Sequence, residues 1–152
     1  MILEPVAVRR AVADDAKGIA ALTDAAYGKY VPRLRRKPQP MMADYHELIA
    51  EHLVWVLCLG EDLVGVLVLM TEPDAMLIYS VAVSPEQQGR GLGRQLLSLA
   101  EDQARQAGFA RIRLYTNEHM VENIELYHRL GYDEIRREHF LGSALVHMAK
   151  TL

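Results

Sequence analysis

The stretch Ser80–Leu97 constrains the fold of this chain more than any other. It is typical of a strand, a turn marked by Pro85, a glycine-rich loop and then a helix. Gly89, Gly91 and Gly93 leave the main chain bare where the helix begins, which permits positive φ angles and close approach of a ligand. A helix N-terminus also offers unpaired N–H groups and a partial positive charge. The stretch therefore predicts an anion site, most naturally for phosphate.

Two common phosphate-binding loops do not fit this stretch. A P-loop requires Lys-Ser or Lys-Thr after its last glycine, and neither pair follows these glycines. The dinucleotide fingerprint requires a glycine at its first, third and sixth positions. The sixth position is Arg94 when counted from Gly89 and Leu96 when counted from Gly91. Arg90 and Arg94 instead add positive charge beside the loop.

Two motifs resemble those of a known family. Residues Gln88–Gly93 are similar to the Gln/Arg-x-x-Gly-x-Gly/Ala signature of the GNAT superfamily of acyl-CoA-dependent N-acetyltransferases. The preceding Val81–Pro85 resembles the family's fourth strand and its exit turn. Further on, Asn123–Tyr132 resembles the family's second cofactor segment, Asn-x-x-x-Tyr-x-x-x-Gly-Phe/Tyr. Because both motifs occur in the family's order, the resemblance is more specific than either motif alone and extends over the chain.

This resemblance implies a mixed α/β (α+β) fold in a single N-acetyltransferase domain, residues 1–152. We expect a central, mostly antiparallel sheet of about six to seven strands, with a parallel pair around the glycine-loop helix and about four helices on its two faces. The residue pattern agrees, because a strand at Met76–Val83, a helix from about Gly91 to Ala107 and a strand from Arg111 form a parallel crossover. The remaining expected elements are a strand near Val6, a helix capped by Asp14 and Asp15 that ends near Tyr27, a short helix at Asp44–His52, hairpin strands at 53–59 and 63–70, a helix from Asn117 to Leu130, and closing strands near 134–138 and 144–150.

Composition excludes several classes of protein. The net charge is −3, from 17 basic and 20 acidic residues, so we expect neither a nucleic-acid nor a membrane partner. The single cysteine, Cys58, cannot form an internal disulfide, and we interpret it as a small buried hydrophobe rather than an acyl carrier. We expect no metal site. The chain shows no secretion signal and no apolar run of about 20 residues, which predicts a cytoplasmic protein.

The resemblance also implies a cofactor, acetyl-CoA, and roles for individual residues. Tyr127 matches the family's general acid near the CoA sulfur, and Asn123, four residues earlier on the same helix face, matches a cofactor contact. The backbone N–H of Val81 is the expected oxyanion contact, provided that the neighbouring strand separates from it. The expected cofactor-binding residues are Val81, Ala82, Val83, Gln88, Gly89, Arg90, Gly91, Leu92, Gly93, Arg94, Asn117, Asn123 and Tyr127.

The general base is left open. Many relatives carry a glutamate late in the fourth strand, whereas this chain has Tyr79 and Ser80 there. An amine must lose a proton before it attacks, so a carboxylate, a histidine or a water chain is expected. The candidates are Tyr79 acting through water, Glu72, Glu118 and His119.

The acceptor site is also left open. Residues 28–41 combine prolines with basic side chains, which indicates either a solvated basic loop or a flexible loop over the acceptor. In GNAT enzymes this region helps to form the acceptor pocket. The resemblance therefore points to Tyr27, Tyr30, Arg33 and Arg35 as substrate residues, and an arginine at 33, 35 or 36 could hold an acidic acceptor.

Together these features predict an N-acetyltransferase that acts on a primary amine of a small molecule or peptide by direct attack in a ternary complex. The alternative is a catalytically idle acyl-CoA-binding regulatory module. The intact Tyr127 favours the enzyme, while the missing strand carboxylate leaves the module open. A nucleic-acid binder built on the basic loop would show a steep salt dependence, which we do not expect. Members of the superfamily are often homodimers, so a homodimer is possible here.

Overall fold

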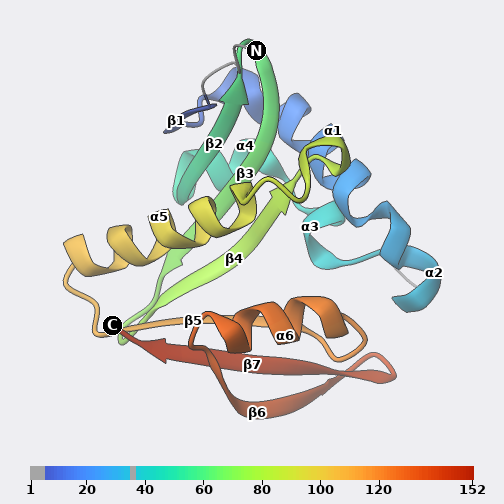
Figure 1. The fold of residues 1–152 in the computed structure, drawn as a ribbon, viewed down its shortest axis with the longest axis vertical. Helices are drawn as coiled ribbons and strands as arrows, with labels where there is room; N and C mark the ends of the chain where they lie inside the picture. The colour runs from blue at the N-terminus through green and yellow to red at the C-terminus, as the bar shows by residue number, and fades with distance from the viewer. Residues whose placement is uncertain (1–5, 35–36) are drawn as a thin grey trace.

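The computed structural model describes residues 6–34 and 37–152, and its centre is a seven-stranded sheet in the order β1-β2-β3-β4-β5-β7-β6 (Figure 1). Each neighbouring pair is antiparallel except β4 and β5, which are parallel. The predicted mixed sheet with one parallel pair is therefore confirmed. The strands are β1 Val6–Arg10, β2 Leu53–Leu59, β3 Asp62–Thr71, β4 Met76–Val83, β5 Arg111–Asn117, β6 Asp133–Phe140 and β7 Ser143–Thr151.

Helices cover both faces of the sheet, as predicted. On one face α5 and α6 lie over the strands, and Leu96 of α5 packs in a core with Met76 of β4 (Figure 1). On the other face α1 and α4 enclose a second core, in which Ile19 packs with Val66 of β3. The helices are α1 Ala16–Tyr27, α2 Val31–Leu34, α3 Gln39–Met42, α4 Tyr45–Glu51, α5 Leu92–Gln106 and α6 Val121–Arg129.

A bulge in β4 opens the sheet at its centre. Ser80 pairs with Val68 and Ile78 pairs with Leu69, so Tyr79 has no partner across the ladder. Such a bulge changes the face that the following side chains point to. Pairing between β4 and β5 extends only from Met76 to Ile78 on the β4 side, and beyond it the two strands separate. The result is a wedge-shaped opening at the C-terminal ends of the two parallel strands.

One expected helix cap is wrong. Asn117 does not begin α6; it ends β5, and its Oδ1 accepts a hydrogen bond from the N–H of His119 at 2.9 Å. Asp15 occupies the N-cap position of α1, as expected, but its carboxylate accepts from the N–H of Val12 at 2.8 Å and pairs with Arg9. Asp44 caps α4, the short helix expected in this region.

The described part of the basic stretch between α1 and α4 contains short helices where a loop was expected. These are a 3-10 turn at Gly28–Tyr30, then α2 and α3. Cys58 is buried in the core between α1 and the sheet, as predicted. Within the part of the chain that the structure describes, no helix has both the length and the apolar character needed to cross a membrane.

Candidate active site

One cavity occupies the wedge between β4 and β5, and a second lies beside it against β4. The first has a volume of about 190 Å³ and the second of about 140 Å³. Tyr27, Val81, Asn123 and Tyr127 line both cavities, so the two spaces meet at these four residues. Each of the four was predicted as a site residue from the sequence. Their meeting point is where two ligands that enter from different sides would touch.

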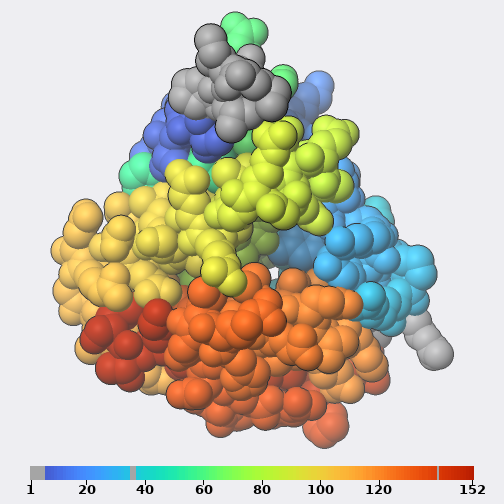
Figure 2. Space-filling model, viewed as in Figure 1, coloured from blue at the N-terminus to red at the C-terminus, as the bar shows by residue number. Residues whose placement is uncertain are grey.

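The second cavity lies between β4, the start of α5 and α6. Figure 2 shows this face hollowed between the yellow-green segment that leads into α5 and the orange α6. Among the predicted cofactor residues, those that line this cavity are Val81, Ala82, Val83, Gln88, Gly93, Asn123 and Tyr127.

The glycine loop presents free main-chain donors beside this cavity. Gly89 and Gly91 have φ angles of 86° and 79°, and open space surrounds the position of a Cβ at each. The first backbone hydrogen bond of α5 runs from Gln95 to Gly91, and within the described residues the N–H groups of positions 89–94 have no acceptor. A 15-residue helix adds its dipole to these donors. The arrangement fits an anion such as a diphosphate.

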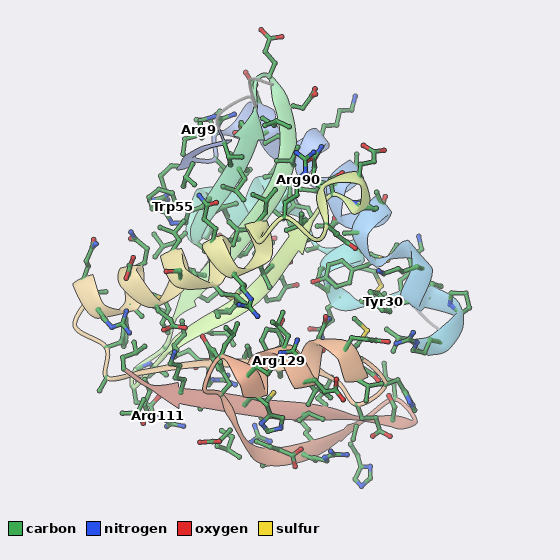
Figure 3. All side chains as sticks on the ribbon, viewed as in Figure 1. Arg9, Tyr30, Trp55, Arg90, Arg111 and Arg129 are labelled. Carbon is green, nitrogen blue, oxygen red and sulfur yellow. The ribbon has the colours of Figure 1, made fainter. Side chains whose placement is uncertain are left out.

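The side chains around the loop play different parts. Arg90 and Arg94 are exposed, and Arg90 lies on the loop that precedes α5 (Figure 3). Leu92 is buried in the core, so only its main chain is available to a ligand. Gln88 steadies the end of β4, because its Nε2 donates to the carbonyl of Val83 at 3.3 Å.

Tyr127 is held rigidly with its hydroxyl free. The residue is 8% exposed, and its ring packs edge-on against Tyr132 with centroids 6.0 Å apart. Gly131, at φ 97°, turns the chain after α6 so that Tyr132 can return beneath Tyr127. Burial, with a smaller effect of Tyr30, raises the pKa of Tyr127 to about 12, because the phenolate would lose its hydration. The hydroxyl therefore keeps its proton at neutral pH.

Val81 lies on β4 beyond the last residue that pairs with β5, so this edge of the strand is not covered by β5. Its carbonyl accepts a hydrogen bond from the hydroxyl of Tyr27 at 3.0 Å, on the side of the cavities. Since a strand residue directs its N–H and C=O toward the same edge, we expect the N–H of Val81 to face the same opening. That geometry is the one an oxyanion contact requires.

The first cavity is lined mainly by apolar and aromatic side chains. One wall comes from Leu34 and from residues within 37–42, together with Tyr79 and Tyr115, and Leu145 of β7 also lines the cavity. Ser80 also lines it but is 3% exposed, and its Oγ is enclosed near the hydroxyls of Tyr27 and Tyr45.

The four candidate bases lie in different surroundings. Tyr79 lines the first cavity, and burial raises the pKa of Tyr79 above its usual value. Glu72 lies elsewhere, in a two-pronged pair with Arg113 at 2.6 Å, and this pairing lowers the pKa of Glu72. Glu118 and His119 follow β5, with His119 Nε2 lying 3.9 Å from Glu118 Oε1. Neither residue is among the described residues that line the cavities.

The expected acceptor residues are also separated. Tyr27 lines both cavities and Tyr30 lines the second; Figure 3 labels Tyr30 beside α2. Arg33 points to α6, where it bonds the carboxylate of Glu122 at 3.0 Å, so it does not face an acceptor. Arg35 and position 36 lie outside the described residues.

Asn117 lines the first cavity instead of the cofactor side. Its Nδ2 donates to Ser143 at 2.9 Å, which joins the end of β5 to β7. Sequence reasoning did not predict most of the first cavity as site residues, since these come from several segments that only the fold brings together. They include Leu34, Lys37, Gln39, Met42, Ser80, Tyr115, Leu141 and Leu145. In the described ranges, no three His, Cys, Asp or Glu side chains group to hold a metal.

Comparison with known proteins agrees with this geometry. A protein-family model described as Acetyltransferase (GNAT) family matches residues 19–132, a range that includes both sequence motifs. The chain is 27% identical over 137 residues to the uncharacterized N-acetyltransferase YjgM of Escherichia coli K12, which covers 84% of this chain and 82% of that protein. It is 35% identical over 69 residues to the ribosomal protein bS18-alanine N-acetyltransferase of the same strain, which covers 44% of this chain and 47% of that protein.

A solved structure shares the fold. The PaiA N-acetyltransferase of Thermoplasma acidophilum, in complex with coenzyme A, superposes with a TM-score of 0.83 at 16% identity. The superposition covers 97% of this chain and 99% of that chain. The arrangement of sheet and helices is therefore common to both proteins.

Proposed function

Because this chain belongs to the GNAT acetyltransferase family, we propose that it transfers an acetyl group from acetyl-CoA to a primary amine of a small molecule or peptide. Acyltransferase activity agrees with the N-acetyltransferase names of its relatives. One observation carries the proposal: two cavities, one beside an anion-binding helix N-terminus and one apolar, meet at Val81 and Tyr127. Such a junction lets an amine attack a thioester directly in a ternary complex.

The second cavity would take the pantetheine arm of acetyl-CoA, whose thioester would supply an activated acetyl group. The free N–H groups of positions 89–94 would hold the diphosphate. Val81–Val83 and Asn123 line the way from that loop to the junction and would contact the pantetheine arm. The coenzyme A in the PaiA structure belongs to that protein, and the shared fold supports the same choice of ligand here.

At the junction, Tyr127 would act as the general acid. Its buried hydroxyl holds a proton and has no partner among the described residues, so it can donate that proton to the sulfur as the C–S bond breaks. The N–H of Val81 would stabilise the negative charge that develops on the carbonyl oxygen. Water in the first cavity, next to Tyr79 and Ser80, would accept the proton that the amine loses.

Release of free thiol from acetyl-CoA in the presence of an amine panel tests this proposal. We expect thiol release to require both acetyl-CoA and an amine, so that neither ligand alone supports it, even at a saturating concentration. A protein that binds acetyl-CoA by calorimetry but releases no thiol with any amine would instead be the idle acyl-CoA-binding module. Cytoplasmic location and a homodimer stay predictions, as does the lack of nucleic-acid and membrane partners.

A further inference from the structure

The groups that face an acceptor in the first cavity are neutral or positively charged. Its titratable lining residues within the described ranges are Tyr27, Lys37, Tyr79, Tyr115 and Tyr127. Burial raises the pKa of each of the four tyrosines, so all remain uncharged at neutral pH. No Asp or Glu is found among the described residues that line this space.

Lys37 is the charged side chain of this lining, and it is exposed at the edge of the cavity. A positive charge at the entrance repels an ammonium ion. An ammonium ion inside an apolar cavity without a counter-charge is also costly, because it loses its hydration. Both effects favour an acceptor that binds as the neutral amine.

The polar atoms of the cavity suit a neutral amine. Thr116 and Asn123 line the cavity, and their side-chain oxygens can accept a hydrogen bond from an uncharged NH₂ group, whereas Ser80 Oγ is enclosed near the hydroxyls of Tyr27 and Tyr45. Tyr115 is already engaged, since its hydroxyl donates to Gln39 at 3.1 Å. The apolar part of the wall includes Leu34, Pro38, Pro40, Met42 and Leu145.

We propose that the acceptor is an α-amino group attached to an apolar side chain, in an amino acid derivative or at a peptide N-terminus, and not a strongly basic alkylamine. This inference rests on the proposed function. In the reaction, the amine nitrogen forms the new C–N bond while the C–S bond breaks and its electron pair goes to sulfur. The nitrogen loses one proton to water, and the sulfur gains one from Tyr127, which is reprotonated from water.

The size of the preference for an α-amine over an alkylamine follows from the fraction of each amine that is neutral at the working pH. An α-amine has a pKa of about 7.7–8.0 and a lysine-like alkylamine of about 10.4. At pH 7 the neutral fraction of the α-amine is therefore larger by roughly 300-fold. A more basic amine is a better nucleophile once neutral, which reduces the advantage. We expect the α-amine to keep a preference of at least about 10-fold.

A matched pair of acceptors tests the proposal at pH 7. Leucinamide and isopentylamine share the same apolar body, and only leucinamide carries an α-amine; Nα-acetyl-lysine amide supplies an ε-amine, and Leu-Gly-Gly amide a peptide source. We expect kcat/KM for thiol release to be higher for leucinamide than for isopentylamine or the lysine derivative. The value for isopentylamine should rise about tenfold from pH 7 to pH 8, and that for leucinamide less. Equal or higher values for isopentylamine or the lysine derivative would overturn the proposal.

Calorimetric affinities in the presence of CoA give a second readout that does not depend on turnover. The α-amines should bind more tightly than isopentylamine. If that order holds while no amine releases thiol, the acceptor class stands and the proposed enzymatic function fails. If thiol is released but the lysine derivative binds and reacts best, the function stands and the acceptor class is wrong. Comparison of leucinamide with Leu-Gly-Gly amide separates a small acceptor from a peptide.

Charge reversal at the entrance gives a variant test. Because Lys37 is exposed, Lys37→Glu should fold normally and should raise the isopentylamine-to-leucinamide ratio of kcat/KM about threefold, since a surface charge that water screens acts modestly. Lys37→Gln is the matched control, and its ratio of kcat/KM should lie between those of the original protein and Lys37→Glu. High salt should reduce the difference. A ratio that is unchanged in both variants would contradict the role of this charge.

Discussion

At the scale of single residues, burial decides what each tyrosine and carboxylate can do. Tyr127 is buried without a charged partner, which keeps its proton in place beside the junction of the cavities. Glu72 is the opposite case, because Arg113 fixes it as a carboxylate. The family motif made Tyr127 a catalytic candidate and residue type alone made Glu72 one, and their surroundings separate the two.

Tyr127→Phe removes the proton donor and keeps the ring that packs against Tyr132. Since general acid catalysis contributes about 10²–10⁴-fold, we expect kcat to fall by about 100-fold or more with little change in the affinity for acetyl-CoA. Steady-state kinetics and calorimetry measure the two effects. Tyr132→Phe is the control, because its hydroxyl faces Glu101 and not the cavities. A kcat within twofold of the original protein would argue against Tyr127 as the acid.

Glu72→Gln should affect stability and not catalysis. The partly buried pair with Arg113 contributes on the order of 1–2 kcal/mol, so the free energy of unfolding should drop by that amount at pH 7. Because Arg113 lowers the folded pKa of Glu72, this contribution is complete above the unfolded pKa of about 4.3 and is lost as the pH falls through the folded pKa. Denaturant unfolding from pH 3 to 8 measures the difference. A changed neutral-pH profile of kcat would show that Glu72 is the base after all.

At the scale of elements, the site depends on one loop and one separation of strands. The glycine loop ends where α5 begins, so its amides point out of the helix. The bulge at Tyr79 ends the pairing of β4 with β5 and frees the edge that carries Val81. Neither feature would form a site without the other.

Gly91→Asp should prevent binding of acetyl-CoA. The new carboxylate would stand at the N-terminus of α5, where repulsion of a diphosphate is worth up to several kcal/mol, so we expect Kd to rise by about 100-fold or more. Calorimetry measures the change. Gly108→Asp is a matched control, since Gly108 has a similar φ of 86° and equally open surroundings at the other end of the helix. Unchanged affinity in Gly91→Asp, or equal loss in both variants, would contradict the placement.

Local patterns in the sequence were enough to predict the core of this arrangement. The order of the strands around the glycine loop, the bounds of β4 and the hairpin of β2 and β3 follow from apolar runs and turn residues. Tyr127, Asn123 and Val81 were found because their motifs are contiguous along the chain.

The acceptor wall could not be predicted in the same way. Lys37, Tyr115 and Leu145 are far apart in sequence, and no local pattern signals that they share a cavity. The cap at Asn117 was wrong for a related reason, because its side chain accepts from the N–H of His119 in the turn after β5 and α6 begins later, at Val121.

At the scale of the whole molecule, two cores on opposite faces support a sheet that is open in the middle. The two cavities share a wall, so under the proposed function each ligand would have its own cavity. We therefore expect initial-rate lines for acetyl-CoA and amine to intersect, as in a ternary complex. Parallel lines, together with acetyl label retained on the protein, would indicate a covalent intermediate, which the buried Cys58 does not suit.

A crystal structure with acetyl-CoA bound tests the central claim most directly. We predict the diphosphate on the main-chain N–H groups of positions 89–94 and the acetyl carbonyl at the N–H of Val81, with the sulfur near the hydroxyl of Tyr127. A structure with the thioester in another part of the molecule, and the glycine loop without the diphosphate, would contradict the account.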